Sequence, residues 1–183
     1  MARGNYRQNI VQDDADRSYF IELMRFSIEK YECKVHSFVL MDNHYHWLLE
    51  TGNIPIWNLM KYFGLNYSAF YNRKYGKIGH LFQGRYKACL VKEDCYFLHV
   101  GRYIHLNPVK AGLAACPEQY RWSSYRTYMG IDRIPFIETE KTFSYFGKNK
   151  IANYRKFTEN NTMDRPLEQI RREMEEDELW LPW

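Results

Sequence analysis

Hydrophobic residues recur at helical spacing in two long stretches of the chain. The first stretch has an acidic start at Asp13 and continues to about Tyr31, with apolar residues at positions 19, 20, 23, 26 and 28. The second runs from about Ile56 to Tyr75 and is followed by Gly76, a residue type that commonly ends helices. Both patterns predict helices.

Two apolar runs lie between these helices, and a short polar break at Asp42 and Asn43 separates them. The segments from Cys33 to Met41 and from His44 to Thr51 therefore predict two strands joined by a tight turn. So short a connection requires an antiparallel pair, which argues against a doubly wound parallel sheet.

The remaining chain predicts smaller elements. The segment "RYKACLV", Arg85 to Val91, has the pattern of a strand, and residues 92–112 that of a helix which Pro108 ends. A further helix is expected from Pro117 to Gly130, and one more helical turn from Ile151 to Phe157. The economical fold is α+β, a ferredoxin-like antiparallel sheet with helices packed on one face.

The segment "FVLMDNHYHWLLE" places two histidines one residue apart in an otherwise apolar strand. Because side chains alternate faces along a strand, His44 and His46 point the same way, about 7 Å apart at their Cα atoms. Two imidazoles so placed can converge on one metal ion, whereas Tyr45 points to the other face. Two buried histidines bonded to backbone carbonyls would show the same pattern, so a third ligand is needed.

The segment "RYIHLNPV" offers that ligand. Tyr103 and Asn107 are four residues apart, so on a helix their Cβ atoms lie about 5–6 Å apart on one face. If this helix packs across the strand with the histidines, two imidazoles and an amide oxygen can hold a cation beside a phenol. Tyr103 could instead be a core aromatic residue, and Asn107 before Pro108 could simply be a helix stop.

A phenol beside a cation suits cleavage of a phosphodiester. A tyrosine hydroxyl is a poor nucleophile at its ordinary pKa of about 10, and a metal on the phosphate withdraws charge and stabilises the leaving oxygen. Attack by Tyr103 would give a 5′-phosphotyrosine and a free 3′-OH. Because one phosphoester replaces another, rejoining needs no nucleotide cofactor.

Charge is distributed unevenly along the chain, whose formal net charge is +4. From Thr158 onward there are three basic and eight acidic residues, whereas residues 1–157 hold 23 basic and 14 acidic residues, a net charge of +9. A basic body favours polyanionic partners, and the chain's sixteen tyrosines suit base stacking. We therefore divide the chain into a domain of residues 1–157 and an acidic tail of residues 158–183.

The four cysteines are widely spaced and include no Cys-x-x-Cys pair, so neither a zinc knuckle nor a disulfide scaffold is indicated. No apolar stretch is long enough to cross a bilayer, and the N-terminus lacks the apolar core of a secretion signal. These features predict a cytoplasmic protein without a membrane partner.

Five segments together resemble the single-tyrosine HUH transposases, specifically the REP-associated tyrosine transposase group within the IS200-like transposases. They are "ARGNYRQNIVQDDADR", "NHYH", "GHLFQGRYKA", "RYIHLNPVKAG" and "RWSSYRTYMG", in the family's order. The resemblance implies a ferredoxin-like fold, a divalent Mg²⁺ or Mn²⁺ ion, and cleavage and joining of single-stranded DNA near hairpins. The chain departs from the family at its beginning, because Met1 stands where the middle of the first strand is expected, so we expect either a short first strand or a misplaced start.

Carried over residue by residue, the resemblance makes His44, His46 and Asn107 the metal ligands and Tyr103 the nucleophile. His99, one turn from Tyr103, is a candidate to orient the phenol or accept its proton, with a plain packing role as the alternative. The candidate DNA contacts lie in or near the motifs and are Arg3, Asn5, Arg7, Gln83, Arg85, Lys87, Arg102 and Lys110.

The predicted function is that of a metal-dependent single-stranded DNA endonuclease and strand transferase that acts near hairpins, as a monomer or a homodimer. The main alternative is a non-catalytic, sequence-specific hairpin-binding protein, and a third is a hydrolase in which His44 and His46 activate water. The tail is expected to be a solvated helix from Met163 to Glu178, or else a DNA mimic that covers the basic body with Trp180 and Trp183 as anchors.

Overall fold

The β-hairpin predicted from the two apolar runs forms the centre of the fold. In the computed structural model, which describes residues 1–91 and 94–160, β2 (Lys34–Leu40) and β3 (His44–Glu50) pair antiparallel. The turn between them closes with a backbone hydrogen bond of 2.8 Å from the Met41 N–H to the carbonyl of His44. The strands fall where the sequence predicts them.

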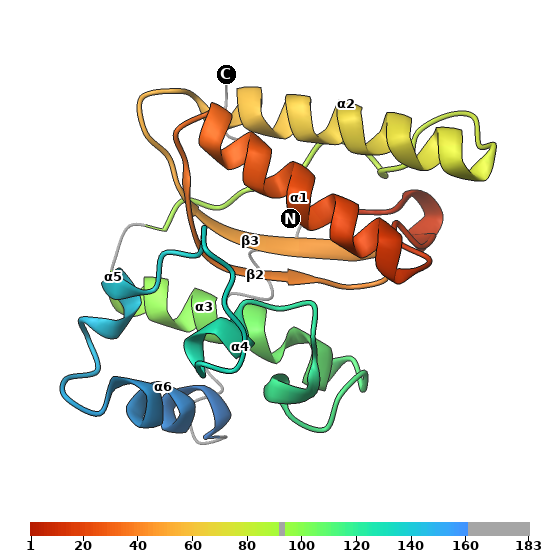
Figure 1. Cartoon of the computed structure of the whole chain (residues 1–183). Helices are drawn as coiled ribbons and strands as arrows, with labels where there is room; N and C mark the ends of the chain where they lie inside the picture. Colours follow the sequence, from red (N-terminus) through yellow and green to blue (C-terminus); the bar gives the residue numbers. More distant parts are fainter. Residues whose placement is uncertain (92–93, 161–183) are drawn as a thin grey trace.

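The other elements surround this hairpin (Figure 1). They are β1 (Ala2–Arg3), the 3₁₀ turn η1 (Asn5–Arg7), α1 (Asp14–Lys30), α2 (Ile56–Tyr75), α3 (Asp94–Lys110), the 3₁₀ turn η2 (Pro117–Gln119), α4 (Tyr125–Tyr128), α5 (Glu140–Phe143) and α6 (Lys150–Glu159). The predicted helical turn over Ile151 to Phe157 is thus confirmed within α6. The residues of the predicted tail helix, like Trp180 and Trp183, lie outside the described residues.

The sheet has the order β1-β3-β2, and each neighbouring pair is antiparallel. The first strand is short, as expected, and pairs Ala2 with Tyr45 and Arg3 with His44. The α+β class and the antiparallel sheet are therefore confirmed.

The predicted strand from Arg85 to Val91 is wrong, because those residues form no regular strand. The chain from residue 81 to residue 87 still runs beside β1. The Gln83 N–H donates to Arg3 and the Lys87 N–H to Met1, each at 2.9 Å. A two-residue β1 offers too few backbone partners for a continuous ladder, so only scattered bonds mark the place of a fourth strand.

Helices α1 and α2 cover one face of the sheet. Asp13 caps α1 by accepting a hydrogen bond from the Asp16 N–H at 2.8 Å, and Gly76 ends α2 in the left-handed region at φ +60°.

The core beneath these two helices is aromatic and centres on Phe20. The Phe20 ring meets four others edge-on: Tyr45 at 5.0 Å, Trp47 at 6.0 Å, Phe63 at 4.8 Å and Tyr67 at 5.0 Å between ring centroids. Alternation along β3 therefore sends Tyr45 and Trp47 into this layer.

We expect Phe20→Leu to lower the free energy of unfolding by about 1–2 kcal/mol, because leucine cannot make these edge-on ring contacts. Urea unfolding followed by circular dichroism would measure the change. Phe26→Leu on the same helix is the matched control, since the Phe26 side chain is 48% exposed, and should change stability by less than about 0.5 kcal/mol. Equal effects at both positions would contradict this account of the core.

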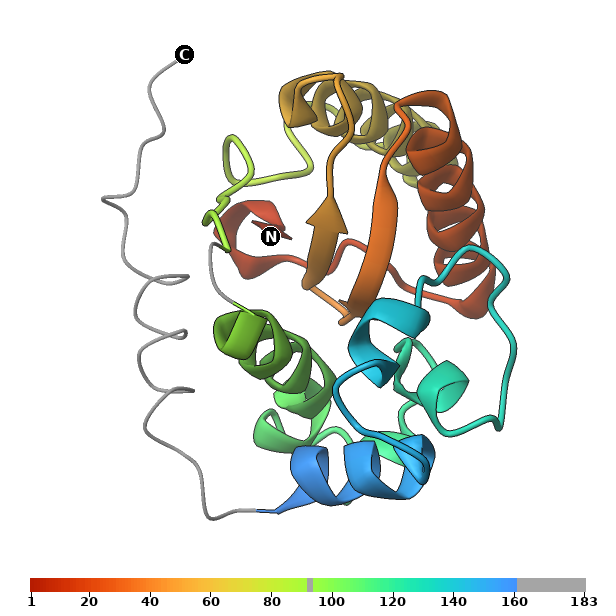
Figure 2. The ribbon, with the colours of Figure 1, turned by 90° about the vertical axis from the view of Figure 1, so that its left-hand side faces the viewer.

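Helix α3 packs on the opposite face, with α6 beyond it (Figures 1 and 2). Val100 and Ile104 of α3 pack with Val39 and Leu48 of the two strands in a second apolar cluster. The expected placement of helices on one face thus holds for α1 and α2, and α3 adds a layer on the other face. Pro108 does not end α3 as predicted, because in the last turn its missing N–H removes only one helical hydrogen bond.

Residues 120–124 run along the outer edge of β2 instead of forming the continuous helix predicted from Pro117 to Gly130. The Leu40 N–H donates to Trp122 at 2.9 Å, and the Ser124 N–H donates to Phe38 at 3.0 Å. This segment forms hydrogen bonds with backbone groups at the edge of β2, so it cannot continue as a helix and it separates η2 from α4. Within the described ranges, no helix has the length and apolar character needed to cross a membrane.

Candidate functional site

The two histidines of β3 point toward α3, as strand alternation predicts. The centroids of the His44 and His46 rings lie 5.2 Å apart, with the ring planes at 84°. His46 is 2% exposed, whereas His44 is half-buried. The pair is therefore close enough to share a ligand, with one ring reached by solvent.

His46 is held as a neutral imidazole. Burial lowers its pKa well below the usual 6.5, and any positive charge on the neighbouring Met1 amino group, His44 or Arg3 lowers the pKa further. Its Nδ1 atom is buried without a hydrogen-bond partner among the described residues. A neutral ring with an unsatisfied buried nitrogen has the chemical character of a metal ligand.

Asn43 orients His44. The Asn43 Oδ1 atom lies 2.6 Å from the His44 Nδ1 atom, and the Asn43 amide nitrogen donates to the carbonyl of Arg7 at 3.3 Å. A proton on Nδ1 of His44 would leave the Nε2 lone pair for a ligand. The sequence indicated Asn43 only as a turn residue. Its position directly before His44 is the feature from which its role in orienting His44 could have been predicted.

Tyr103 extends from α3 toward the histidines. Its ring centroid lies 5.6 Å from that of His46 at an interplanar angle of 86°, and its side chain is 5% exposed. The Lys110 ammonium lies 6.0 Å from the centroid of the Tyr103 ring. The structure therefore brings the phenol, both imidazoles and a cation to one place between β3 and α3.

Asn107 lies one turn after Tyr103 and is half-buried. Its amide nitrogen donates to the carbonyl of Tyr103 at 3.0 Å, which directs this end of the amide into the helix and leaves the oxygen as its possible metal ligand. The described residues contain no cluster of three or more His, Cys, Asp or Glu side chains able to hold a metal ion. Within the part of the chain that the structure describes, a third protein ligand to a cation at His44 and His46 would thus be of another type, such as an amide oxygen.

Two predicted residues of α3 face away from this place. The Arg102 side chain is 1% exposed and donates to the carbonyls of Thr158 at 3.0 Å and Asn160 at 2.5 Å, so its prediction as a DNA contact is wrong. The His99 ring packs 5.4 Å from that of Phe157 on α6. Both residues lie on the flank of α3 that meets α6, which favours the packing role for His99.

The other candidate DNA contacts lie in the N-terminal segment and the segment beside it. Arg7, Gln83 and Arg85 are exposed, and Arg3, Asn5 and Lys87 are half-buried. Backbone pairing of Arg3 with His44 and of Gln83 with Arg3 places these two segments next to the histidines. They form a cationic border on the β1 side of the site.

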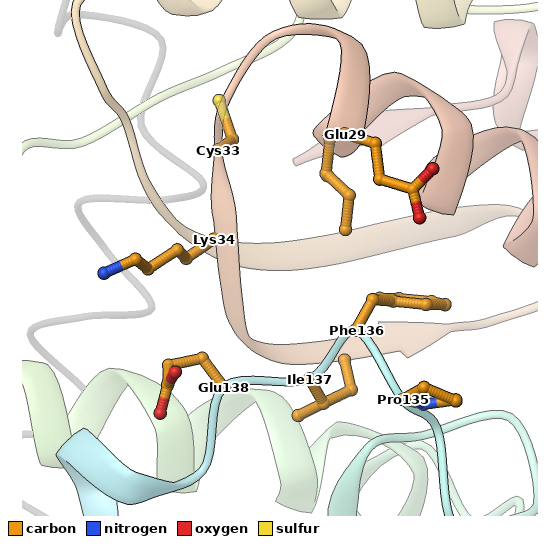
Figure 3. Close-up of a pocket in the computed structure, with 8 residues that line it drawn as sticks. Glu29, Cys33, Lys34, Pro135, Phe136, Ile137 and Glu138 are labelled. Atoms are coloured by element: carbon orange, nitrogen blue, oxygen red, sulfur yellow. The ribbon is translucent and has the colours of Figure 1, made fainter.

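A shallow pocket elsewhere contains none of these residues. It lies between the end of α1, the start of β2 and the segment from Pro135 to Glu138 (Figure 3). Glu29, Lys34 and Cys33 line it together with apolar side chains, and burial raises the pKa of the Cys33 thiol. A thiol held protonated in this way is a weak nucleophile, which argues against Cys33 as a reactive group.

Comparisons with known proteins agree with the resemblance that the sequence motifs indicate. A family model described as "Transposase IS200 like" matches residues 1–107. The solved structure of a REP-associated tyrosine transposase bound to a REP hairpin is similar to this chain, with a TM-score of 0.60 at 13% identity over 75% of this chain and 87% of that chain. At that identity the likeness establishes the fold. Comparison with curated proteins gives no match.

Proposed function

The chain belongs to the family of IS200-like transposases, and we propose that it is a metal-dependent endonuclease and strand transferase that acts on single-stranded DNA near hairpins. The observation that carries this proposal is the edge-to-face placement of the Tyr103 ring against His46, whose partner His44 lies at 5.2 Å. A phenol beside two neighbouring imidazoles is an arrangement suited to metal-assisted attack of tyrosine on a phosphodiester.

In the proposed cleavage, the Tyr103 Oη atom attacks the phosphorus of the scissile phosphodiester. The bond between Oη and phosphorus forms as the bond from phosphorus to the 3′ oxygen breaks. The phenolic proton is released, and the departing oxygen takes up a proton to become a free 3′-OH. Joining is the reverse reaction with a second 3′-OH, and the phosphotyrosine conserves the bond energy for it.

The residues present fit a divalent ion. His46 offers a neutral ring with an unsatisfied buried nitrogen, His44 is oriented by Asn43, and the Asn107 amide oxygen is the candidate third ligand. Imidazole and amide oxygen ligands suit Mg²⁺ or Mn²⁺, which when bound would supply charge stabilisation at the phosphate and the leaving oxygen. The protein's own part is to position the phosphate and the phenol.

DNA binding is assigned to the cationic border. Within this border Arg3, Arg7, Arg85 and Lys87 would contact phosphates, and Asn5 and Gln83 would add polar contacts. Lys110 of α3 would contact a phosphate beside Tyr103. The related transposase of known structure is bound to a REP hairpin, which supports a hairpin as the DNA element for this chain too. No nucleotide cofactor is needed.

One observation favours the alternative of a hairpin-binding protein without turnover. Tyr103 is only 5% exposed, so a phosphodiester reaches its hydroxyl only if neighbouring side chains move. A protein that never makes this movement would bind hairpins through the same cationic border and leave them intact. The two functions therefore share the DNA and differ in the product.

The test is denaturing gel electrophoresis of the protein with a library of hairpin oligonucleotides labelled at the 3′ end, with and without Mn²⁺. The label remains on the fragment that acquires the new 5′ phosphate, so a phosphotyrosine appears as an SDS-stable labelled protein band. A metal-dependent band supports the proposal. Binding in native gels without such a band would favour the non-catalytic protein, and cleavage without the band would identify water as the nucleophile.

Asn43→Ala should weaken the affinity for Mn²⁺ about tenfold, because loss of a group that orients a ligating histidine typically costs 10- to 100-fold. Isothermal titration calorimetry of the purified protein measures the change directly. Asn43→Asp, which keeps an acceptor oxygen near Nδ1 of His44, is the matched control and should retain more of the affinity. If Asn43→Ala bound Mn²⁺ as tightly as the unaltered protein, Asn43 would have no part in orienting His44.

A further inference from the structure

The turn that follows β1 presents an aromatic ring to solvent. Tyr6 is 95% exposed, although aromatic side chains are normally buried at least in part. Its backbone is in the left-handed region at φ 49°, and that of Arg7 is there too at φ 58°. Two consecutive non-glycine residues in this region are strained, and such strain is typical of ligand-binding segments.

The turn is rigid because several contacts fix its backbone. The Gly4 N–H donates to Asn43 at 2.8 Å, the Arg7 N–H donates to Gly4 at 2.9 Å, and the Gln8 amide nitrogen donates to Leu81 at 3.2 Å. A Cβ atom on Gly4 would lie 2.1 Å from the carbonyl oxygen of Gln8, so the turn requires glycine there. The ring of Tyr6 is thus presented from a fixed base.

A second exposed apolar side chain lies on the neighbouring loop. Ile78 is fully exposed, and its loop adjoins the turn because the Lys77 ammonium lies 3.4 Å from Oε1 of Gln8. Arg7 and Lys77 are exposed beside the two apolar groups. Two isolated apolar side chains next to basic residues do not form the contiguous apolar patch of a protein interface. They are instead complementary to a nucleic-acid strand, because its bases are apolar and its phosphates are anionic.

The turn is also joined to the candidate active site. Asn43 accepts the hydrogen bond from Gly4, donates to the carbonyl of Arg7 and lies 2.6 Å from Nδ1 of His44. The residue that orients His44 therefore also holds both ends of the segment that carries Tyr6. A strand bound at this turn would lie next to the place where its phosphodiester is to be cleaved.

We propose that Tyr6 is a stacking platform for an unpaired base in the single-stranded DNA that flanks the hairpin, with Ile78 in contact with the same strand. The inference rests on the proposed function and adds to it the element that recognises the unpaired flank. Arg7 and Lys77 neutralise phosphates on either side of the stacked base. Tyr6 adds no affinity for a duplex stem, because the bases of a stem are already stacked on each other.

The test measures binding of the full chain to two oligonucleotides by fluorescence anisotropy in Mn²⁺-free buffer: a blunt hairpin and the same hairpin with a single-stranded flank. Tyr6→Ala should weaken binding of the flanked hairpin about tenfold, the size of one lost base stack, and leave the blunt hairpin unchanged. Tyr6→Trp should restore the affinity. Phe26→Ala, at an exposed aromatic residue of α1, is the matched control and should change neither affinity.

A second readout reports stacking itself. With 2-aminopurine placed in the flank, the unaltered protein should change its fluorescence at one position, and Tyr6→Ala should abolish that change. Equal affinities of Tyr6→Ala and the unaltered protein for the flanked hairpin would overturn the assignment of Tyr6 while hairpin binding stands. If the unaltered protein bound neither oligonucleotide, the proposed function and this inference would fall together.

Discussion

Tyr103→Phe is expected to eliminate the SDS-stable protein–DNA adduct and to lower the cleavage rate by at least about 10³-fold, because it removes the attacking oxygen and nothing else. The ring contact with His46, at 5.6 Å between centroids, is kept by phenylalanine, so the fold and the affinity for hairpin DNA should be preserved. Adduct formation on denaturing gels and hairpin binding in native gels measure the two quantities separately.

The matched control for Tyr103→Phe is Tyr120→Phe. Tyr120 is also near the sheet, but its hydroxyl donates to the carbonyl of Leu40 at 2.9 Å, and burial raises the pKa of Tyr120 to about 12. Tyr120→Phe should form the adduct at the normal rate. An adduct that persisted in Tyr103→Phe would move the nucleophile to another tyrosine, which peptide mapping of the labelled protein would identify.

Removal of the divalent ion is expected to stop cleavage, and loss of a histidine ligand to reduce it at least about 100-fold. Chelation with EDTA should abolish the adduct, and added Mn²⁺ should restore it. His46→Ala removes a buried ring whose Nδ1 has no partner among the described residues, so it should abolish tight Mn²⁺ binding. Electron paramagnetic resonance of Mn²⁺ measures that binding without reference to activity.

His80→Ala is the control for the histidine variant, because His80 is exposed on the loop after α2 and should retain both Mn²⁺ binding and cleavage. The melting temperature of each variant separates a lost ligand from a lost fold. Normal Mn²⁺ affinity in a folded His46→Ala protein would exclude His46 as a ligand and require another residue in its place.

The sequence predicted the parts of the fold whose residues carry strong periodic or turn signals. The hairpin around Asp42 and Asn43 and the helix that ends at Gly76 are both found, because short-range chemistry alone determines them. The prediction failed where tertiary contacts decide. Residues 120–124 bond to the edge of β2 in place of forming a helix, and the segment after residue 84 pairs with too short a β1 to become a strand.

The same distinction applies to the site. Strand alternation predicted that His44 and His46 share a face, and helical spacing placed Tyr103 and Asn107 on one face of a helix. That this helix packs across the strand was only a condition at the level of sequence, and the structure meets it by bringing Tyr103 beside His46. Arg102 shows why adjacency in sequence is a poor guide to surface contacts. Arg102 is one residue before Tyr103 on α3, so its side chain points about 100° away from that of Tyr103 and is buried against α6.

The anchoring of Arg102 has a mechanical consequence for Tyr103, the proposed nucleophile. Its guanidinium holds the carbonyls at the C-terminal end of α6, and one turn later His105 shares a hydrogen bond of 2.8 Å with the Tyr154 hydroxyl of α6. Any displacement of α3 that opens a path to Tyr103 must either break these bonds or move α6 by the same amount. The two helices are therefore mechanically coupled, and a force that displaces α6 would also shift the position of Tyr103.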